Sequence, residues 1–474
     1  PTFCRWRSPS GNDLLLVYQK DYGEDEVLPD GKTVVSINFT GDNHGPHSYE
    51  RVKKIYADLR KRYPQAQLVG ASFNDVAREL LLIKKDLPVV TSEIGDTWIF
   101  GYGGAPIRMA KFRAVSRLYS QWLNEGKIKK DSDVALDFAA ELGLIAEHTQ
   151  GVDVKTHLRQ WDKYDMDKFL KGRSEGIFSM AEASWKEIDN YIDSAIAFLP
   201  ASLQKEAREV VAEVDKVKLE DNSKMKPMER KRWEQPIAGG MTLAGLSYQM
   251  FDGDDYDDFQ NRYLRARYGW ALDDLGKRGL KESHAVSVTL YAQTMAQSVR
   301  KEKKGTRIIT ELRFPENEKV DKRVYPERIQ VNCFTTKNGK RSEVALTIYG
   351  KPAVRLPESY WLSFTVPGIE SVIAEKMGER VDLMDVVEKG NRQMHGIDRY
   401  VDLITSGETI RISSKEAFLL NVGEAQGLNY STNYPDKRKG AHFNLNNNLW
   451  GTNFSMWNEG SLTYHFVIET LNRK

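Results

Sequence analysis

The first hundred residues alternate apolar runs of strand length with amphipathic runs of helical length. The apolar runs are rich in β-branched residues, which predicts buried strands at 33–40, 66–72 and 87–93. Two runs with helical spacing, 48–64 and 72–85, separate them. Because strand and helix alternate, we expect parallel strands joined by right-handed crossovers, as in part of a (β/α) barrel.

The following region reads almost entirely as helix. Apolar residues recur at helical spacing along 108–123, namely Met109, Phe112, Val115, Leu118 and Trp122. Further helical runs follow at 132–147, 154–170, 179–200 and 203–217. Their short connections predict a helical bundle.

Short β-rich runs separated by turns dominate from about residue 235, which predicts a large β-sandwich. A polar, proline-containing segment at 218–236 marks the edge of this region. The predicted fold class is therefore α/β plus all-α plus all-β in several domains. The C-terminal part of a (β/α) barrel is expected over 1–105, the helical bundle over 106–220 and the β-sandwich over 221–474.

The chain opens on Pro1 and reads at once as strand, turn and strand. A complete (β/α) barrel needs about 250 residues, and the alternating pattern here covers about half of one. We therefore expect the front part of the barrel to lie outside this sequence, either removed by processing or carried by a second chain.

Composition removes several function classes. The 474 residues carry 69 basic and 67 acidic side chains, a net charge of +2, which predicts no general attraction for nucleic acid or anionic membranes. We expect no membrane span, because no run of about 18 apolar residues occurs. Cys4 and Cys333 support neither a disulfide framework nor a cysteine metal site. Phosphate-loop, zinc-protease and serine-elbow motifs are absent from the sequence.

Polar side chains follow the predicted strands, where a barrel presents its functional groups. Asp42 and His44 follow the run at 33–40, and Asp96 and Trp98 follow the run at 87–93. A carboxylate beside an aromatic ring suits a sugar, because the acid accepts hydroxyl hydrogen bonds while the ring stacks. The alternatives are a helix cap or turn for Asp42 and simple core packing for Trp98.

A third polar cluster, Glu147-His148-Thr149, ends a helical run. One interpretation is a polar C-terminus, since a histidine there suits the helix dipole. The other is a site residue presented by the helical region.

Several segments, taken in order, resemble family thirty-eight glycoside hydrolases, the zinc-dependent retaining α-mannosidases, and are most similar to an uncharacterised bacterial branch. These segments are FCRWRSPSGNDLLLVY, INFTGDNHGP, LVGASFNDVARELL, LPVVTSEIGDTWIFGYGGAPIRMAKFRAVSRLY, GKPAVRLPESYWLSF, GNRQMHGIDRY and NNNLWGTNFSMW. The resemblance spans nearly the whole chain.

The resemblance implies a glycosidase acting on α-linked sugars. It implies that His148 is a Zn²⁺ ligand and that Asp42 is the acid/base carboxylate of a retaining mechanism. The family's nucleophile and its other zinc ligands belong to earlier barrel strands, so this chain alone is expected to be inactive. Glu147 and Thr149 depart from the family's His and Asp, which leaves open a degenerate protein that binds carbohydrate without hydrolysis.

The same resemblance, together with residue chemistry, nominates groups that would contact an oligosaccharide or glycoside substrate. Near the barrel these are His44, Asp96, Trp98 and Thr149. In the β-region they are Arg392, Trp450 and Asn453, which lie in glycine-bounded segments able to hydrogen-bond or stack on sugars. Packing and turn chemistry inside the sandwich is the alternative for the last three.

Overall fold

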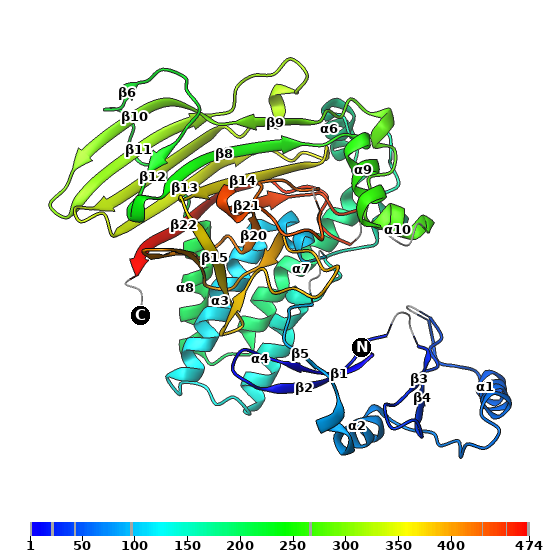
Figure 1. Cartoon of the computed structure of the whole chain (residues 1–474). Coiled ribbons are helices and arrows are strands. Elements are labelled where there is room, and N and C mark those ends of the chain that lie inside the picture. Colours follow the sequence, from blue (N-terminus) through cyan, green and yellow to red (C-terminus); the bar gives the residue numbers. More distant parts are fainter. Residues whose placement is uncertain are drawn as a thin grey trace. The chain divides into compact units, whose positions relative to one another are not determined.

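The computed structural model describes residues 2–19, 23–41, 44–94, 98–264, 268–428, 430–451 and 453–471. The chain divides into two compact units, Pro1–Glu93 and Ile94–Lys474. Both helices and large sheets are present, so the chain is a mixed α/β, multidomain protein (Figure 1). The predicted boundaries at residues 105 and 220 stay predictions.

The first unit is built on small sheets. Strand β1 (Phe3–Arg7) pairs antiparallel with β2 (Asp13–Val17) and parallel with β5 (Val89–Val90), while β3 (Asp25–Val27) forms a hairpin with β4 (Val34–Ser36). Helices α1 (Tyr49–Arg62) and α2 (Phe73–Leu82) complete it. A small core holds it together, formed by Phe3, Leu28, Val35, Leu80 and Leu87.

This unit differs from the predicted alternation in two places. The run at 33–40 contributes only a short antiparallel strand, and residues 66–72 form no strand. Val69 is 70% exposed, so the apolar side chains that suggested a buried strand there have no surface to bury against. The barrel itself stays a prediction.

The second unit begins with helices. These are η2 (Trp98–Gly104), α3 (Pro106–Asn124), α4 (Asp133–Gly143), η3 (Leu144–Ala146), α5 (Val154–His157), α6 (Met166–Ser174), α7 (Ser179–Ala197) and α8 (Ala201–Asp215). Pro106 starts α3 at a position that needs no N–H, and Ser132 caps α4 by accepting from the Ala135 amide. The long helices α3, α4, α7 and α8 share a core that includes Trp122, Phe138 and Ile196.

Two antiparallel sheets make up the rest of the unit. The larger has the order β16-β15-β18-β19-β22-β13-β12-β11-β10-β6. Its strands are β6 (Lys226–Pro227), β10 (Gln293–Lys301), β11 (Gly305–Arg313), β12 (Arg328–Thr336), β13 (Arg341–Lys351), β15 (Ile369–Lys376), β16 (Glu379–Asp382), β18 (Tyr400–Thr405), β19 (Thr409–Ser414) and β22 (Gly460–Leu471).

The smaller sheet has the order β17-β20-β21-β14-β8-β7, with β9 also paired to β8. Its strands are β7 (Gln235–Pro236), β8 (Thr242–Met250), β9 (Val288–Tyr291), β14 (Glu358–Thr365), β17 (Met394–Gly396), β20 (Leu419–Val422) and β21 (Ala441–Asn447). Helices α9 (Gly253–Tyr263) and α10 (Gly269–Asp274) follow β8.

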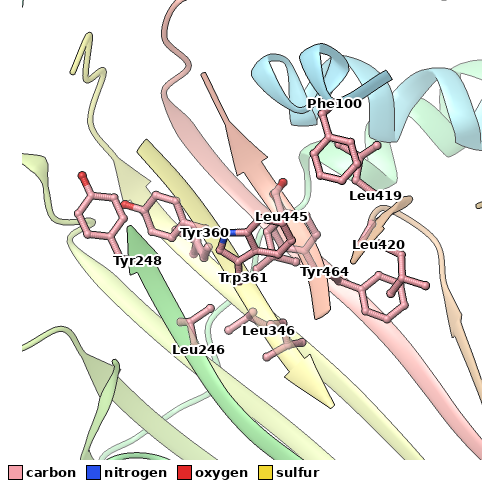
Figure 2. Packing of buried hydrophobic residues seen from close by; sticks show 14 of the residues in the cluster. Phe100, Leu246, Tyr248, Leu346, Tyr360, Trp361, Leu419, Leu420, Leu445 and Tyr464 are labelled. Carbon is pink, nitrogen blue, oxygen red and sulfur yellow. The ribbon is translucent and has the colours of Figure 1, made fainter. Parts of the chain in front are cut away.

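The two sheets pack face to face. Figure 2 shows Tyr360 and Trp361 of the smaller sheet in one buried cluster with Leu346 and Tyr464 of the larger sheet. Phe466 of β22 meets the ring of Phe364 on β14 at 5.4 Å between centroids. Such contacts between facing sheets are the core of a sandwich.

The helices join this sandwich directly, on the side of β20 and β21 (Figure 1). The ring of Trp185 on α7 lies 4.7 Å from that of Trp457, which follows β21 in the chain. On α3, the buried guanidinium of Arg113 donates hydrogen bonds to carbonyls of the β-region, those of Ile397, Asp398, Ser414 and Lys415. The helical and β-rich regions therefore form one compact unit.

Two further observations bear on the sequence predictions. No helix within the described ranges is both long and apolar enough to cross a membrane. Cys4 and Cys333 are both buried free thiols.

Candidate functional site

The loop that carries Glu147, His148 and Thr149 is fixed by hydrogen bonds from a buried glutamine, Gln150. Gln150 is 2% exposed, and its amide donates to the carbonyls of Ile145 at 2.7 Å and Glu147 at 2.8 Å. Its own oxygen accepts from the guanidinium of Arg108 at 3.0 Å. A fully bonded buried amide fixes the backbone on both sides of it.

Arg108 and Tyr102 extend this support to neighbouring elements. Arg108, on α3, also donates to Asp189 at 2.5 Å and to the carbonyl of Trp185 at 2.7 Å, both on α7. The hydroxyl of Tyr102, on η2, donates to the Ala146 carbonyl at 2.8 Å. The loop is thus anchored to three helical elements at once.

Within this loop, the Glu147 carboxylate contacts both of the residues that follow it, His148 and Thr149. It accepts from the Thr149 amide at 2.7 Å and from the Thr149 hydroxyl at 3.4 Å, and it contacts Nδ1 of His148. Loss of water contact works to raise the pKa of Glu147, but the hydrogen bonds from Thr149 outweigh it and hold that pKa below its usual value. Glu147 is therefore an anion at neutral pH.

This pairing decides which ring nitrogen of His148 can bind a ligand. A carboxylate on Nδ1 favours a proton there, which leaves the lone pair on Nε2. The side chain is 67% exposed, so a metal ion or substrate can reach the imidazole from solvent. Carboxylate-supported histidines of this kind are common metal ligands.

A complete metal centre needs more donors than this loop offers. A catalytic zinc usually has three protein ligands. Across the part of the chain that the structure describes, no three His, Cys, Asp or Glu side chains gather in a group that could hold a metal ion. The described residues alone therefore do not fit a catalytic zinc.

The strand-end candidates belong in part to residues that are not described. Asp42 and Asp96 both lie outside the described ranges. His44 is described and exposed in the first unit, in a shallow hollow with His47 and Arg51. His148 and Thr149 belong to the second unit.

Trp98 and Asn453 lie close to the sandwich core. Trp98 is half-buried in η2, with its ring 6.2 Å from that of Phe454. Asn453, the residue before Phe454, is half-buried with a φ of 42°. A positive φ is a conformation that asparagine tolerates better than most residues.

Trp450 and Arg392 make the contacts of packed residues. Trp450 is 2% exposed, with its ring 5.8 Å from Phe259 and 5.6 Å from Tyr430. Buried Arg392 donates to the carbonyls of Val386, Val387, Gly390 and Thr432. The packing alternative describes these contacts, and a substrate role for either residue stays a prediction.

Sequence patterns did not reveal a cleft beside Arg108. It has a volume of about 600 Å³ and lies between α3, α7 and residues 455–459. Arg173 lines the cleft and donates to Glu182 at 2.8 Å and to Glu459 at 2.7 Å. The indole of Trp457 also donates to Glu182, at 3.0 Å. Mixed charges with indole edges can hydrogen-bond and stack on a polar ligand.

Comparisons with known proteins give one family model and several solved structures. The family, described as a domain of unknown function (DUF5054), matches residues 103–234, which span the helices α3 to α8. No curated protein matches the chain.

Two of the similar solved structures come from Enterococcus faecalis. An α-mannosidase from strain V583 is 8% identical, with a TM-score of 0.49, and a protein in glycosyl hydrolase family 38 is 9% identical, with a TM-score of 0.42. Each match covers 100% of this chain and 69% of the other. A putative aldose 1-epimerase from Escherichia coli K12 is 10% identical, with a TM-score of 0.20, covering 38% of this chain and 69% of that one. Likenesses this distant assign no function.

Proposed function

We propose that the protein is a glycoside hydrolase acting on α-linked sugars, in which His148 is one ligand of a catalytic zinc. The observation that carries the proposal is the Glu147–His148 pair, in which an exposed imidazole on an anchored loop contacts the carboxylate through Nδ1. The pair stands at the position that the resemblance to retaining α-mannosidases assigns to a zinc ligand. Bound zinc would act as a Lewis acid on the substrate.

In this proposal the chain's residues have separate roles. Glu147 holds the tautomer and orientation of His148. Asp42 protonates the leaving oxygen and later activates water, as the acid/base group of a retaining enzyme does. The nucleophile and remaining zinc ligands are supplied by barrel strands that have no counterpart in these 474 residues.

The surface of the first unit supports this need for further strands. Several of its large apolar side chains are exposed, among them Tyr49, Val69, Phe73 and Leu82. Helix α1 has no buried residue, although its apolar positions predicted a covered face. Apolar faces of this kind are normally covered by neighbouring elements of a barrel or by a partner.

A second function, carbohydrate binding without hydrolysis, is favoured by Thr149. Its hydroxyl donates to Glu147, so it does not stand in for the carboxylate that the family offers to sugar hydroxyls. The mixed-charge cleft beside Arg108 could hold a saccharide without any chemistry.

Metal analysis of the natural protein tests the zinc ligand. We expect His148→Ala to lower zinc content and hydrolysis of aryl α-glycosides together, because one of the ligands is lost. His284→Ala is the matched control, since His284 is also exposed and its Nδ1 also contacts a carboxylate, that of Asp165 at 3.1 Å. Zinc content that stays the same in both variants would remove His148 from the site, and zinc without hydrolysis would favour the binding function.

Leaving-group dependence tests Asp42. Removing a general acid typically costs about 10²- to 10⁴-fold in rate. Asp42→Asn in the natural protein should lose this much on glycosides with poor leaving groups and much less on activated aryl glycosides, which need little protonation. Equal loss on both substrates contradicts the assignment.

A further inference from the structure

A small hollow in the second unit lies between the helical region and the segment around α10. It has a volume of about 10 Å³, which is room for one water-sized particle. Its walls include Tyr164, Asp273, Lys277, Arg278 and Arg355. None of these groups belongs to the His148 loop.

Lys277 lines this hollow, and its ammonium group has weak hydrogen-bond acceptors. Nζ donates to the Trp450 carbonyl at 3.3 Å and contacts the sulfur of Met456 at 3.1 Å. A thioether is a weak acceptor, and an ammonium has three protons to place. Lys277 makes no ion pair with a described carboxylate.

Arg355 is the second cation of the hollow, and it is 2% exposed. Its guanidinium donates to the carbonyls of Gln160 at 2.8 Å, Lys163 at 3.4 Å and Leu158 at 3.5 Å. The rings of Tyr164 and Phe178 lie 4.8 and 5.1 Å from it. All of these partners are neutral. The carboxylate of Asp162 also acts on Arg355, but Asp162 is largely exposed and lies 3.7 Å from the ammonium of Lys163, so it offsets the charge of Arg355 only weakly.

The other titratable groups of the hollow do not supply the missing negative charge. Asp273 lies 3.7 Å from Arg278, so these two charges offset each other. Burial raises the pKa of Tyr164 to about 12, and its hydroxyl donates to the Arg278 carbonyl, so it stays neutral. When Lys277 is protonated, Lys277 and Arg355 are two like charges in a buried site, and this arrangement is costly without a counterion.

We infer that the hollow between Lys277 and Arg355 is a binding site for a small monovalent anion of chloride size. The ligand class follows from the walls: two cations demand negative charge, and the volume admits one atom-sized ion and excludes sulfate or phosphate. The ion would accept hydrogen bonds from Lys277 and Arg355 and so link the segment after α10 to the loop between β13 and β14.

The inferred site makes anion binding depend on pH. Burial, and then the charge of Arg355, lower the pKa of Lys277 to about 7 when no anion is bound. A bound anion favours the protonated amine, so binding takes up a proton and weakens as pH rises through 7. Anion binding should therefore be strong at pH 6 and weak at pH 9.

Thermal unfolding in chloride against gluconate, at equal ionic strength, tests the site. Gluconate is too large for the hollow. Replacing 200 mM gluconate by chloride at pH 6 should raise the Tm of the wild type by about 2 °C or more, and by much less at pH 9. Lys277→Met should abolish this difference, whereas Lys281→Met should keep it, because Lys281 is an exposed lysine paired with Asp257.

Equal shifts in all three proteins, or no shift in the wild type, would overturn the inference. Diffraction from wild-type crystals in bromide at pH 6 gives an answer that does not depend on any variant folding. We expect an anomalous peak between Lys277 Nζ and the Arg355 guanidinium. Water without anomalous signal at that position overturns the site.

Discussion

Burial decides how single side chains of this protein respond to pH, and His442 is the sharpest case. It lies on β21 and is 6% exposed, with Nδ1 2.8 Å from the Ser363 hydroxyl. Burial lowers its pKa to about 4, because a charged imidazole would lose its water, and the backbone of Gly423 and the charge of Glu424 offset this loss only in part. The folded protein therefore keeps His442 neutral.

This shift predicts a loss of stability in mild acid. An unfolded histidine titrates near pH 6.5, so between about 6.5 and 4 the unfolded chain binds a proton that the folded chain refuses. The stability that His442 contributes is complete above pH 6.5 and falls as pH drops towards 4, by about 3 kcal/mol at one pKa unit per 1.4 kcal/mol. Urea unfolding at pH 7 and pH 4.5 should show a flatter pH dependence for His442→Gln than for the wild type.

His465 provides the control for that experiment. Its ring is half-exposed and contacts Glu416 at 3.0 Å, so His465→Gln should not flatten the curve in the same way. A wild type and a His442→Gln variant with parallel pH curves would mean that His442 is already charged or hydrated in the folded state.

At the residue scale the sequence revealed polar groups more readily than their partners. The sequence indicated the polar pair of Glu147 and His148, because residues that are adjacent in the chain are also adjacent in space. Gln150 and Arg108 were missed as its support, since their contact joins positions 42 residues apart. For Trp450 and Arg392 the sequence did not separate substrate contact from packing, because aromatic and guanidinium side chains serve both roles equally well.

At the scale of strands, a buried ion pair links the two sheets. Lys351 at the end of β13 contacts Glu358 at the start of β14, with Nζ 2.6 Å from Oε1. Glu358 also accepts from the hydroxyl of Tyr248 at 2.8 Å, and Lys351 donates to the Asn458 carbonyl at 2.9 Å. Burial raises the pKa of Glu358, and the nearby Lys351 opposes that rise.

Breaking this pair from one side should cost far more than removing it. Lys351→Met leaves a carboxylate buried without its cation, which typically destabilises by about 3–5 kcal/mol. Adding Glu358→Leu should restore most of that loss, because an apolar pair needs no counter-charge. Denaturant midpoints of the single and double variants measure both effects.

An exposed pair supplies the comparison. Lys322 lies 2.8 Å from Glu316 with both side chains more than half exposed, and Lys322→Met should cost less than about 1 kcal/mol. If Lys351→Met costs no more than Lys322→Met, the buried pair is solvated in the native protein.

Strand patterns succeeded where a face is buried and failed at 66–72, where it is not, whereas helix α1 forms as predicted without a buried residue. The runs that predicted strands in the β-region form β11, β12, β13 and β14, because alternating apolar residues there meet the facing sheet. In the first unit the run at 66–72 also contains apolar residues, but it does not pair with another strand and forms none itself. Periodicity reports what a segment can bury, and the rest of the fold decides whether it does.

At the scale of the whole molecule, the two compact units differ in the size of their cores. The core cluster of the first unit has five buried apolar residues, whereas the second unit has a large core that runs from helical residues through both sheets and a further core among its long helices. A small core gives a domain little stability of its own. We therefore expect two calorimetric transitions, with the first unit melting at the lower temperature.

Truncation separates this division from the one predicted by sequence. A fragment of residues 94–474 should keep the upper transition within about 2 °C of the full chain, because its core is intact. A fragment of residues 221–474, the β-domain expected from the sequence, should lose it. That cut removes Arg113, which donates to the carbonyls of Ile397, Asp398, Ser414 and Lys415, and the indole of Trp185 that packs on Trp457. Carbonyls and aromatic faces that were buried would then meet water, so the sandwich should expose apolar surface and melt early or aggregate.

If the fragment of residues 221–474 melts as the full chain does, the helices are a separate domain and the boundary at residue 220 is correct. If instead residues 94–474 lose the upper transition, the first unit contributes to the main core.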